Sequence, residues 1–526
     1  MLDVVIRGGL VVNPEGAVQA DVGIEGGRVV SVGDASGTAA RLDLDATGHN
    51  VMPGFVDAHS HLDMALWDEP VHLPTLHQGV TTVVLGQDGT SVAPGSPTTI
   101  TDMRRYFAAV NGRREHIPAN WGSVGEYLGR VDGASTLNVA YLVPNGNLRL
   151  DTIGWDARPA TGEDMRAMSD ALALGLEQGA VGLSSGLDYV PSMCADTSEL
   201  SHLCSVVRDA GAVYVTHMRG YDERSPAGFA EVSEIGRRSG AKLHISHLMG
   251  RAERHIPMVD RLVEEGLDLS FDSYPYLAGC TTLAMLGLPP ELQQSGPGRT
   301  LALLADPDTK ATLRKEWFPG MSRSIGAFRL TYVDAPGLEH LEGASVFEAC
   351  DTLGLDIADL VCTLLVESGL AVGVIEPNSL GDDDLRATHR HPLHMAGSDG
   401  IYIGSSPHPR GWGTFARYLG RYGRDRGDLT WCGAARHLAT AAAERFGLRD
   451  RGRVALGQFA DVVVLDPSAV IDTATFQHPK SHALGVRHVL VNGVPALVNG
   501  RPTGNRPGRA LRRESLGRGG VGSLIR

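Results

Sequence analysis

Two histidines separated by a single residue, His59 and His61, could bind a metal ion. They end an apolar segment, residues 55–61, that follows a Pro-Gly turn and is predicted to form a short buried strand. Side chains two positions apart on a strand face the same side, so both imidazoles and Asp57 would project together. Neutral imidazole binds zinc and related divalent cations. The chain contains 20 histidines, so this pair could also arise by chance. The rest of the sequence distinguishes a metal site from a chance pair.

A carboxylate follows the next predicted strand, residues 81–85. The strand leads into residues 86–89, where Gly86 and Gly89 lie on either side of Gln87 and Asp88. Glycines let the backbone and a neighbouring carboxylate approach a buried centre closely. Asp88 is therefore predicted to be a further metal ligand.

The composition is that of a soluble globular protein. Hydrophobic residues make up 42% of the 526 residues and charged residues 21%. A net charge of -14 argues against nucleic acid, which needs a basic surface. The first residues lack the pattern of a signal peptide, and no apolar run is long enough to cross a bilayer. The six cysteines show no Cys-x-x-Cys spacing and are expected to be free thiols. We expect a cytoplasmic protein without a membrane partner.

Both ends of the chain consist of short predicted strands joined by tight turns. This pattern covers residues 2–49 and returns at residues 457–466 and 486–493. We expect residues 1–54 and 451–526 to build one small β-sandwich. The end rich in glycine and arginine, residues 499–526, is expected to be loosely held.

Residues 55–450 alternate between predicted strands and amphipathic helices, which indicates a parallel sheet with helical crossovers. The number of strands and the length of the segment favour a (β/α)8 barrel. Residues 289–356 fit no barrel unit and are predicted to be an inserted subdomain. The predicted strands after residue 79 are 80–85, 138–143, 181–184, 213–217, 242–247, 267–274 and 396–399, and predicted helices include 162–178, 198–210 and 227–239.

In such a barrel the catalytic groups lie at the carboxyl ends of the strands. His244 is expected to be a core residue of the barrel wall. Imidazoles and a carboxylate that hold metal, with a second carboxylate near a water molecule, are what a hydrolytic metal site needs. The residues at the predicted strand ends are His59, His61, Asp88, His217, His247 and Asp399.

The chain resembles the amidohydrolase superfamily and, within it, the N-acyl-D-amino-acid deacylase (D-aminoacylase) family. The resemblance covers nearly the whole chain and includes the split β-domain. It also rests on an ordered series of motifs at residues 53–61, 182–191, 217–219, 245–247, 272–276, 397–400 and 408–410.

This resemblance implies roles for individual residues. His217 and His247 would bind the principal metal ion, and His59 and His61 would shape a second, weaker site. The resemblance implies that the metal is zinc and that Asp399 is the general acid and base. The residues that it implies at the substrate are Arg410, Tyr276, Tyr274, Tyr189 and Met249.

The chain departs from the family pattern at three places. The family usually has cysteine where this chain has Asp88; aspartate can also bind a divalent metal, but a hard oxygen in place of a thiolate alters metal preference. Met249 stands where the family tends to have a lysine that helps to grip a carboxylate. Residues 144–147 read Pro-Asn-Gly-Asn in place of a Gly-His-Gly-Thr type segment. The reaction class is therefore predicted more firmly than the substrate.

The distribution of lysines argues against one group of relatives. Hydantoinase-like and dihydroorotase-like amidohydrolases bridge two metals through a carboxylated lysine on a middle strand of the barrel. Here the first lysine of the chain is Lys242, so that bridge cannot form.

The predicted function is metal-dependent hydrolysis of a linear amide, an N-acyl-D-amino acid, by activated water. One alternative is a cyclic amide, a dipeptide or another specialised amide as the substrate. Another is a non-catalytic binding protein on the same scaffold. The predicted partner is a small-molecule amide, and the sequence leaves open whether several copies assemble.

Overall fold

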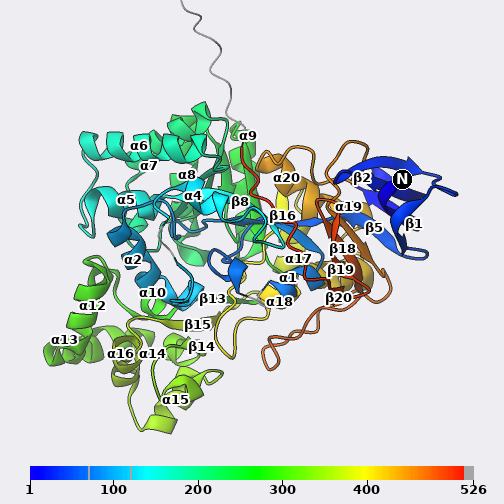
Figure 1. Cartoon of the computed structure of the whole chain (residues 1–526). Coiled ribbons are helices and arrows are strands. Elements are labelled where there is room, and N and C mark those ends of the chain that lie inside the picture. Colours follow the sequence, from blue (N-terminus) through cyan, green and yellow to red (C-terminus); the bar gives the residue numbers. More distant parts are fainter. Residues whose placement is uncertain (69–71, 119–120, 514–526) are drawn as a thin grey trace, which may run out of the picture.

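Eight parallel strands form a barrel in the computed structural model, which describes residues 1–68, 72–118 and 121–513 (Figure 1). The sheet runs from β6 to β16, and it closes because Ala58 N donates to the carbonyl of Ala396 at 3.1 Å and Asp399 N to that of His59 at 2.8 Å. The predicted barrel is thus confirmed. Its strands are β6 (Phe55–Asp57), β7 (Val80–Leu85), β8 (Asn138–Pro144), β9 (Gly182–Gly186), β10 (Val213–His217), β11 (Lys242–Ile245), β12 (Leu269–Ser273) and β16 (His394–Ala396).

Amphipathic helices cover the outside of the barrel (Figure 1). Helix α6 begins with a capping box between Thr161 and Asp164 and buries Met168, Leu172 and Leu176. The three helices predicted from the sequence correspond to α6, α7 and α8 within two residues at each end. Helices outside the inserted subdomain are α1 (Leu73–His77), α2 (Pro97–Tyr106), α3 (Ala108–Asn111), α4 (Val124–Gly129), α5 (Asn145–Ile153), α6 (Gly162–Glu177), α7 (Thr197–Asp209), α8 (Ser225–Ser239), α9 (Ala252–Glu264), α17 (Asp382–Arg390), α18 (Arg410–Arg417), α19 (Trp431–Ala435) and α20 (Ala441–Arg445).

The two ends of the chain build one β-domain beside the barrel, as predicted (Figure 1). Strand β5 from the first end pairs with β17 from the second, and apolar side chains of both ends share one core. The long strand β1 pairs with β4 through its first half and with β5 through its second, and its pairing with β2 shifts register between Ile6 and Gly9. The strands are β1 (Leu2–Asn13), β2 (Gly16–Glu25), β3 (Arg28–Gly33), β4 (Ala40–Asp45), β5 (Asn50–Pro53), β17 (Val462–Leu465), β18 (Val486–Val491), β19 (Val494–Val498) and β20 (Arg501–Pro502).

An inserted subdomain with its own apolar core separates β12 from β16 (Figure 1). A three-stranded antiparallel sheet, β13 (Ala278–Thr282), β15 (Val372–Pro377) and β14 (Arg329–Val333), supports it. These elements extend beyond the predicted segment 289–356, and the division of the chain at residues 54 and 450 stays a prediction. The helices are α10 (Leu283–Gly287), α11 (Pro290–Gln293), α12 (Gly296–Ala305), α13 (Pro307–Thr312), α14 (Phe318–Gly326), α15 (Val346–Leu353) and α16 (Ile357–Glu367).

The C-terminal segment is held against the barrel as far as Arg513. Val139 N donates to the carbonyl of Arg509 at 2.9 Å, and Leu511 N donates to that of Val139 at 2.7 Å. The prediction of a loosely held end is wrong for residues 499–513, because β20 pairs with β19 and these backbone bonds attach the segment to the start of β8. Residues 514–526 lie outside the described residues.

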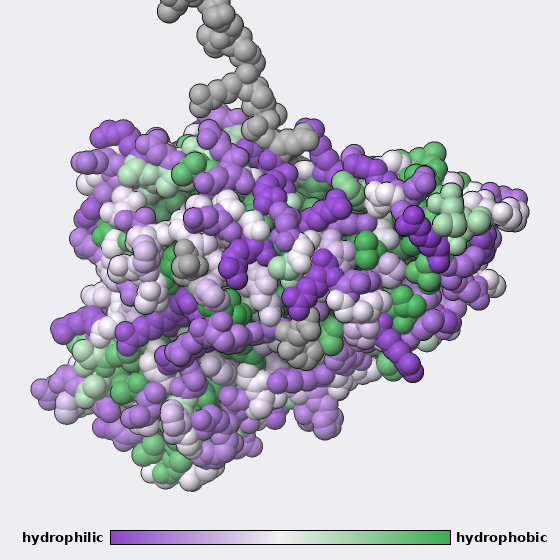
Figure 2. Space-filling view, viewed as in Figure 1, coloured by the Kyte–Doolittle hydropathy of each residue, from purple (hydrophilic) through white to green (hydrophobic). Residues whose placement is uncertain are grey.

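The described residues include no helix that is both long and apolar enough to cross a membrane. All six cysteines carry free thiols. Hydrophilic side chains cover most of the face in Figure 2, and apolar side chains form scattered groups on it.

Candidate metal centre

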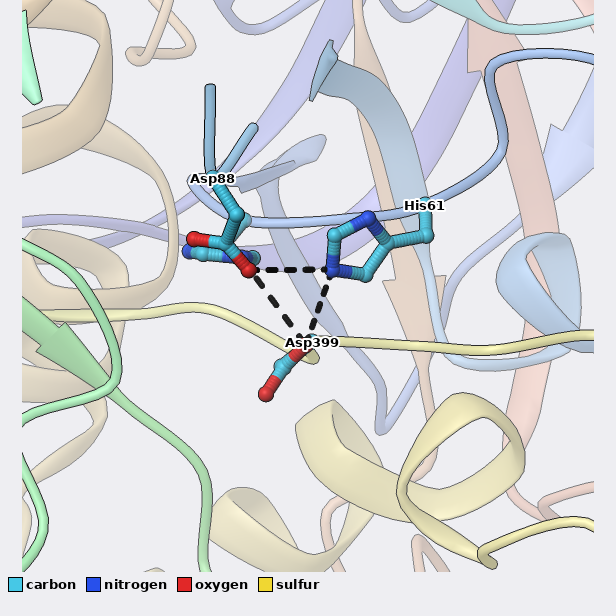
Figure 3. A group of neighbouring side chains, drawn as sticks. His61, Asp88 and Asp399 are labelled. Atoms are coloured by element: carbon cyan, nitrogen blue, oxygen red, sulfur yellow. Dashed lines mark ion pairs between the residues drawn. The ribbon is translucent and has the colours of Figure 1, made fainter. Parts of the chain in front are cut away.

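The side chains at the carboxyl ends of the barrel strands converge in two groups of metal-binding type. The first contains His59, His61, Asp88 and Asp399, and the second contains Asp88, His217 and His247. Within each group the candidate ligand atoms lie within 4.8 Å of one another. Figure 3 shows His61, Asp88 and Asp399 pointing toward one another. All six residues named from the strand ends therefore meet, and all are buried.

The two groups share Asp88. Its Oδ2 lies 3.6 Å from Nε2 of His59 and 3.6 Å from Nε2 of His61, whereas its Oδ1 lies 3.6 Å from Nε2 of His247. One carboxylate oxygen thus faces each group. Such a carboxylate is suited to bridging two divalent ions, and its oxygens suit hard or borderline metals.

The second group is oriented by Asp188. His217 Nδ1 lies 3.1 Å from Nε2 of His247, and its other nitrogen, Nε2, lies 3.4 Å from Asp188 Oδ2. Burial opposes ionisation of Asp188, but His217 and Arg224 lower its pKa overall. A carboxylate on the outer nitrogen of an imidazole fixes the orientation of the ring. Asp188 lies in the motif at residues 182–191, and its place in the sequence did not indicate this role.

Asp272 is a second orienting carboxylate that sequence reasoning missed. It is fully buried, and its Oδ2 lies 2.8 Å from His244 Nε2 and 3.6 Å from His59 Nδ1. The backbone N of His247 donates to its Oδ1 at 2.9 Å. Burial alone would raise the pKa of Asp272, but His59 and His244 hold it well below its usual range. Asp272 thus connects both groups, and His244 lies outside them in the barrel wall.

The backbone at three of these residues is left-handed. Asp88, His247 and Asp399 have φ angles of 53°, 33° and 48°. Non-glycine residues adopt this region at a cost, and it is found preferentially at functional sites. Gly86 is required beside Asp88, because a Cβ there would lie 2.3 Å from the carbonyl oxygen of Leu142. The sharp turns after β7, β11 and β16 aim the three side chains at a common centre.

The residues present fit a divalent cation. Nδ1 and Nε2 of His59, Nδ1 of His61 and Oδ1 of Asp88 are buried and make no hydrogen bond within the described part of the chain. Burial disfavours the charged form of His61, yet Asp399 and Asp88 outweigh it and raise its pKa to about 9. The carboxylates therefore stabilise positive charge at this point, and imidazole with carboxylate is a typical donor set for zinc.

Asp399 lies between the first group and an arginine. Its Oδ1 is 3.2 Å from His61 Nε2 and its Oδ2 is 2.9 Å from Arg410 Nη1. Burial would raise the pKa of Asp399, but the Arg410 guanidinium and the nearby imidazoles lower it to about 2. Arg410 is fully buried, donates from Nη2 to the carbonyl of Cys280 at 3.0 Å and lies 4.6 Å from the centre of the Tyr274 ring.

A cavity of about 500 Å³ opens onto these groups. Of the residues expected at the substrate, four line this cavity: Tyr189, Tyr274, Met249 and Arg410. Tyr276 is not among its lining residues. Its ring lies 4.6 Å from the Arg417 guanidinium and 5.3 Å from the His408 ring, so Tyr274 is the tyrosine of this pair that faces the cavity.

Asp57 belongs to neither group. Its carboxylate accepts hydrogen bonds from N and Oγ of Ser398 at 2.7 and 2.5 Å. The sequence predicted that Asp57 projects together with His59 and His61 into the metal site, and this prediction is wrong. Asp57 instead ties β6 to the turn that carries Asp399.

Two characterised proteins are similar to this chain over nearly its whole length. N-acyl-D-glutamate deacylase from Alcaligenes xylosoxydans xylosoxydans is 34% identical, and the alignment covers 98% of this chain and 97% of that protein. D-aminoacylase from the same organism is 32% identical over 97% of this chain and 98% of that protein.

Solved structures are also similar over nearly the whole chain. The crystal structure of N-acyl-D-glutamate deacylase from Bordetella bronchiseptica, complexed with zinc and a phosphonate inhibitor, superposes with a TM-score of 0.83 at 30% identity and covers 97% of this chain and 100% of that one. A D-aminoacylase crystal structure gives a TM-score of 0.81 at 30% identity, covering 98% and 100%. The model of the amidohydrolase family matches residues 44–496. The chain therefore belongs to the amidohydrolase family.

Proposed function

We propose that this protein is a zinc-dependent deacylase that hydrolyses N-acyl-D-amino acids to a carboxylate and a free D-amino acid. The similarity to N-acyl-D-glutamate deacylase and D-aminoacylase over nearly the full length supports this activity. The two groups of histidine and aspartate side chains at the strand ends, which could hold metal ions, support the metal dependence. The relatives do not favour a cyclic amide as substrate, and the assembled site argues against a non-catalytic binding protein.

One observation supports the substrate class above the others. One carboxylate oxygen of Asp399 lies 3.2 Å from the candidate metal ligand His61. The other oxygen lies 2.9 Å from the guanidinium of Arg410. A substrate carboxylate bound by the planar guanidinium would thus lie next to the reacting amide. An N-acyl α-amino acid has this arrangement, because its amide nitrogen and its carboxylate are attached to the same α-carbon.

The proposed mechanism assigns proton transfer to Asp399. His217, His247 and Asp88 would hold a divalent cation, with His59 and His61 at a second position; when bound, such a cation would lower the pKa of a water molecule and polarise the amide carbonyl. Because Asp399 is ionised, it accepts the proton of the attacking water, whose oxygen bonds to the carbonyl carbon. Protonated Asp399 then gives that proton to the amide nitrogen as the C–N bond breaks.

The remaining lining residues position the substrate. Arg410 orients the carboxylate, and the rings of Tyr189 and Tyr274 shape the cavity around it. Met249 contributes an apolar surface where the related enzymes tend to have lysine, which favours apolar groups at this part of the cavity. We also propose a cytoplasmic location, which the free cysteines support because reducing compartments keep thiols free.

Turnover of paired enantiomers tests the proposal. We expect the zinc-loaded enzyme to release amine from N-acetyl-D-methionine much faster than from N-acetyl-L-methionine. Asp399→Asn should lower kcat by about a thousandfold, since general acid–base catalysis contributes on that order, while the ligands of the second group still bind metal. Hydrolysis of both enantiomers at equal rates, or full activity of Asp399→Asn, would refute the assignment.

A further inference from the structure

A second cavity lies at the opposite end of the barrel from the metal centre. Its volume is about 600 Å³, and it is lined by residues at the amino ends of the strands, among them Val181, Val213 and Lys242. The catalytic groups lie at the carboxyl ends of the same strands. The two cavities share no lining residue.

The charge of this second cavity is opposite to that of the chain. Seven arginines and Lys242 contribute to its lining, against a single acidic residue, Asp450. The whole chain carries a net charge of -14. Cations gathered at a concave surface raise the local concentration of anions.

Carboxylates in the described residues neutralise only part of this charge. Arg28 pairs with Asp450 at 3.1 Å, Arg445 with Asp268 at 2.7 Å, and Arg512 with Asp132 at 3.0 Å. Arg451 pairs with Asp461. These four ion pairs account for Arg28, Arg445, Arg451 and Arg512 among the cationic side chains of the lining.

Two of the cationic side chains have no carboxylate within 4.0 Å in the part of the chain that the structure describes. Lys242 is exposed at the start of β11, and Arg509 projects from the C-terminal segment that is held against β8. Their backbones are fixed by the sheet, so both charges are available to a ligand without rearrangement of the chain.

An aromatic ring holds several of the guanidinium groups in place. The guanidinium carbons of Arg28 and Arg451 lie 4.0 and 4.2 Å from the centre of the Phe459 ring, and that of Arg509 lies 6.0 Å from it. Cation–π contacts orient these groups before any ligand arrives. Because guanidinium groups cover the ring, Phe459 is not free to stack on a nucleobase.

We propose that this cavity binds a small anion that carries two or more phosphate groups. Guanidinium forks match phosphate oxygens in geometry, and several of them spread over one cavity suit a ligand with more than one such group. The volume fits a small molecule. A nucleic acid is disfavoured, because the chain as a whole is strongly acidic.

The four lysines of the chain make a direct test possible. Lys242 lines the cavity, whereas Lys310, Lys315 and Lys480 lie elsewhere. Full-length, metal-loaded enzyme is acetylated with N-hydroxysuccinimidyl acetate, with and without fructose 1,6-bisphosphate, and modified lysines are quantified by peptide mass spectrometry. We expect the bisphosphate to slow modification of Lys242 by about tenfold and to leave the other three unchanged, because a bound ligand covers only this amine. Equal modification of Lys242 with and without ligand would overturn the proposal.

Calorimetric titration separates this site from the active site. We expect saturable binding of fructose 1,6-bisphosphate at about 0.15 M salt, weaker binding of inorganic phosphate and none of fructose. The double substitution Lys242→Gln and Arg509→Gln should lower the affinity for the bisphosphate by tenfold or more. This is about the effect of losing one charge-assisted contact. The matched control, Lys315→Gln with Arg166→Gln, should bind as the unaltered enzyme does, and so should Asp399→Asn. Loss of binding in Asp399→Asn, equal weakening by the control, or equal affinity for phosphate and bisphosphate would contradict the proposal.

Discussion

The carboxylate of Asp399 and the guanidinium of Arg410 form a buried ion pair, with 2.9 Å between Oδ2 and Nη1. The other carboxylate oxygen faces His61. This pair connects the candidate metal ligands with the group that would hold a substrate carboxylate. It therefore sets how far the reacting bond can lie from the carboxylate of the substrate.

Replacing Arg410 should reveal which part of the substrate it holds. We expect Arg410→Lys to lower kcat/KM for N-acetyl-D-methionine by about a hundredfold, because a single ammonium cannot reproduce the two-pronged contact. The corresponding carboxamide, which lacks the charge, should lose much less. Arg417→Lys is the matched control, since Arg417 stacks on Tyr276 outside the cavity. An equal loss for both substrates would show that Arg410 does not bind the carboxylate.

Asp88 is the ligand that both metal groups share, so its removal should affect both. We expect Asp88→Ala to retain less than one equivalent of zinc by elemental analysis. Asp88→Cys should keep metal and shift the preference toward softer ions such as cadmium, because thiolate is a softer donor than carboxylate. Asp164→Asn changes a carboxylate at the start of α6, outside both groups, and should keep full metal content. Normal zinc content in Asp88→Ala would exclude the shared role.

Asp272 should act on metal binding through the histidines that it contacts. We expect Asp272→Asn to raise the zinc dissociation constant by about ten- to a hundredfold, the usual effect of losing an outer hydrogen-bond partner of a ligand. Competition with a chelator measures this constant, and circular dichroism confirms that the variant is folded. A folded variant with unchanged zinc affinity would remove Asp272 from the account.

Stability should fall in mild acid because of buried histidines away from the site. Burial, and after it the neighbouring His437, lower the pKa of His389 to about 3. Its proton is thus bound by the unfolded chain but not by the folded one between pH 6.5 and 3, so its contribution to stability is present above pH 6.5 and is lost as the pH falls. The free energy of unfolding should drop by about 2 kcal/mol more between pH 7 and 5 in the unaltered protein than in His389→Gln.

Urea unfolding at the two pH values measures this difference. The exposed His202 on α7 provides the control, and His202→Gln should keep the steep pH dependence. If His389→Gln and the unaltered protein lose stability in parallel, His389 is not held neutral in the folded state.

The sequence identified the candidate metal-binding residues because they follow a simple rule. Residues at the carboxyl ends of parallel strands share one face of a barrel, so strand prediction alone was enough to bring His59, Asp88, His217 and Asp399 together. His247 was identified too, although it follows the end of β11 in a left-handed turn. The role of Asp272 could not be predicted, because it depends on the pairing of β11 with β12 that places it beside His244.

Other features depend on contacts between distant residues. The first and last strands of the inserted subdomain, β13 and β15, pair with each other although most of the subdomain's sequence lies between them. No local sequence pattern shows this pairing. Tyr274 and Tyr276 follow the end of β12, where alternation of side chains no longer applies, so sequence could not tell which one faces the cavity. The C-terminal segment has the composition of a loose end, but its backbone bonds to β8 hold it.

Reconstitution of the metal-free enzyme tests the central claim most directly. Zinc is removed with a chelator and returned stepwise, while bound zinc and turnover of N-acetyl-D-methionine are measured on the same samples. We predict no turnover without zinc and activity that rises in proportion to the first equivalent bound. Full turnover by enzyme shown to be free of metal, or zinc binding that leaves turnover unchanged, would contradict the account.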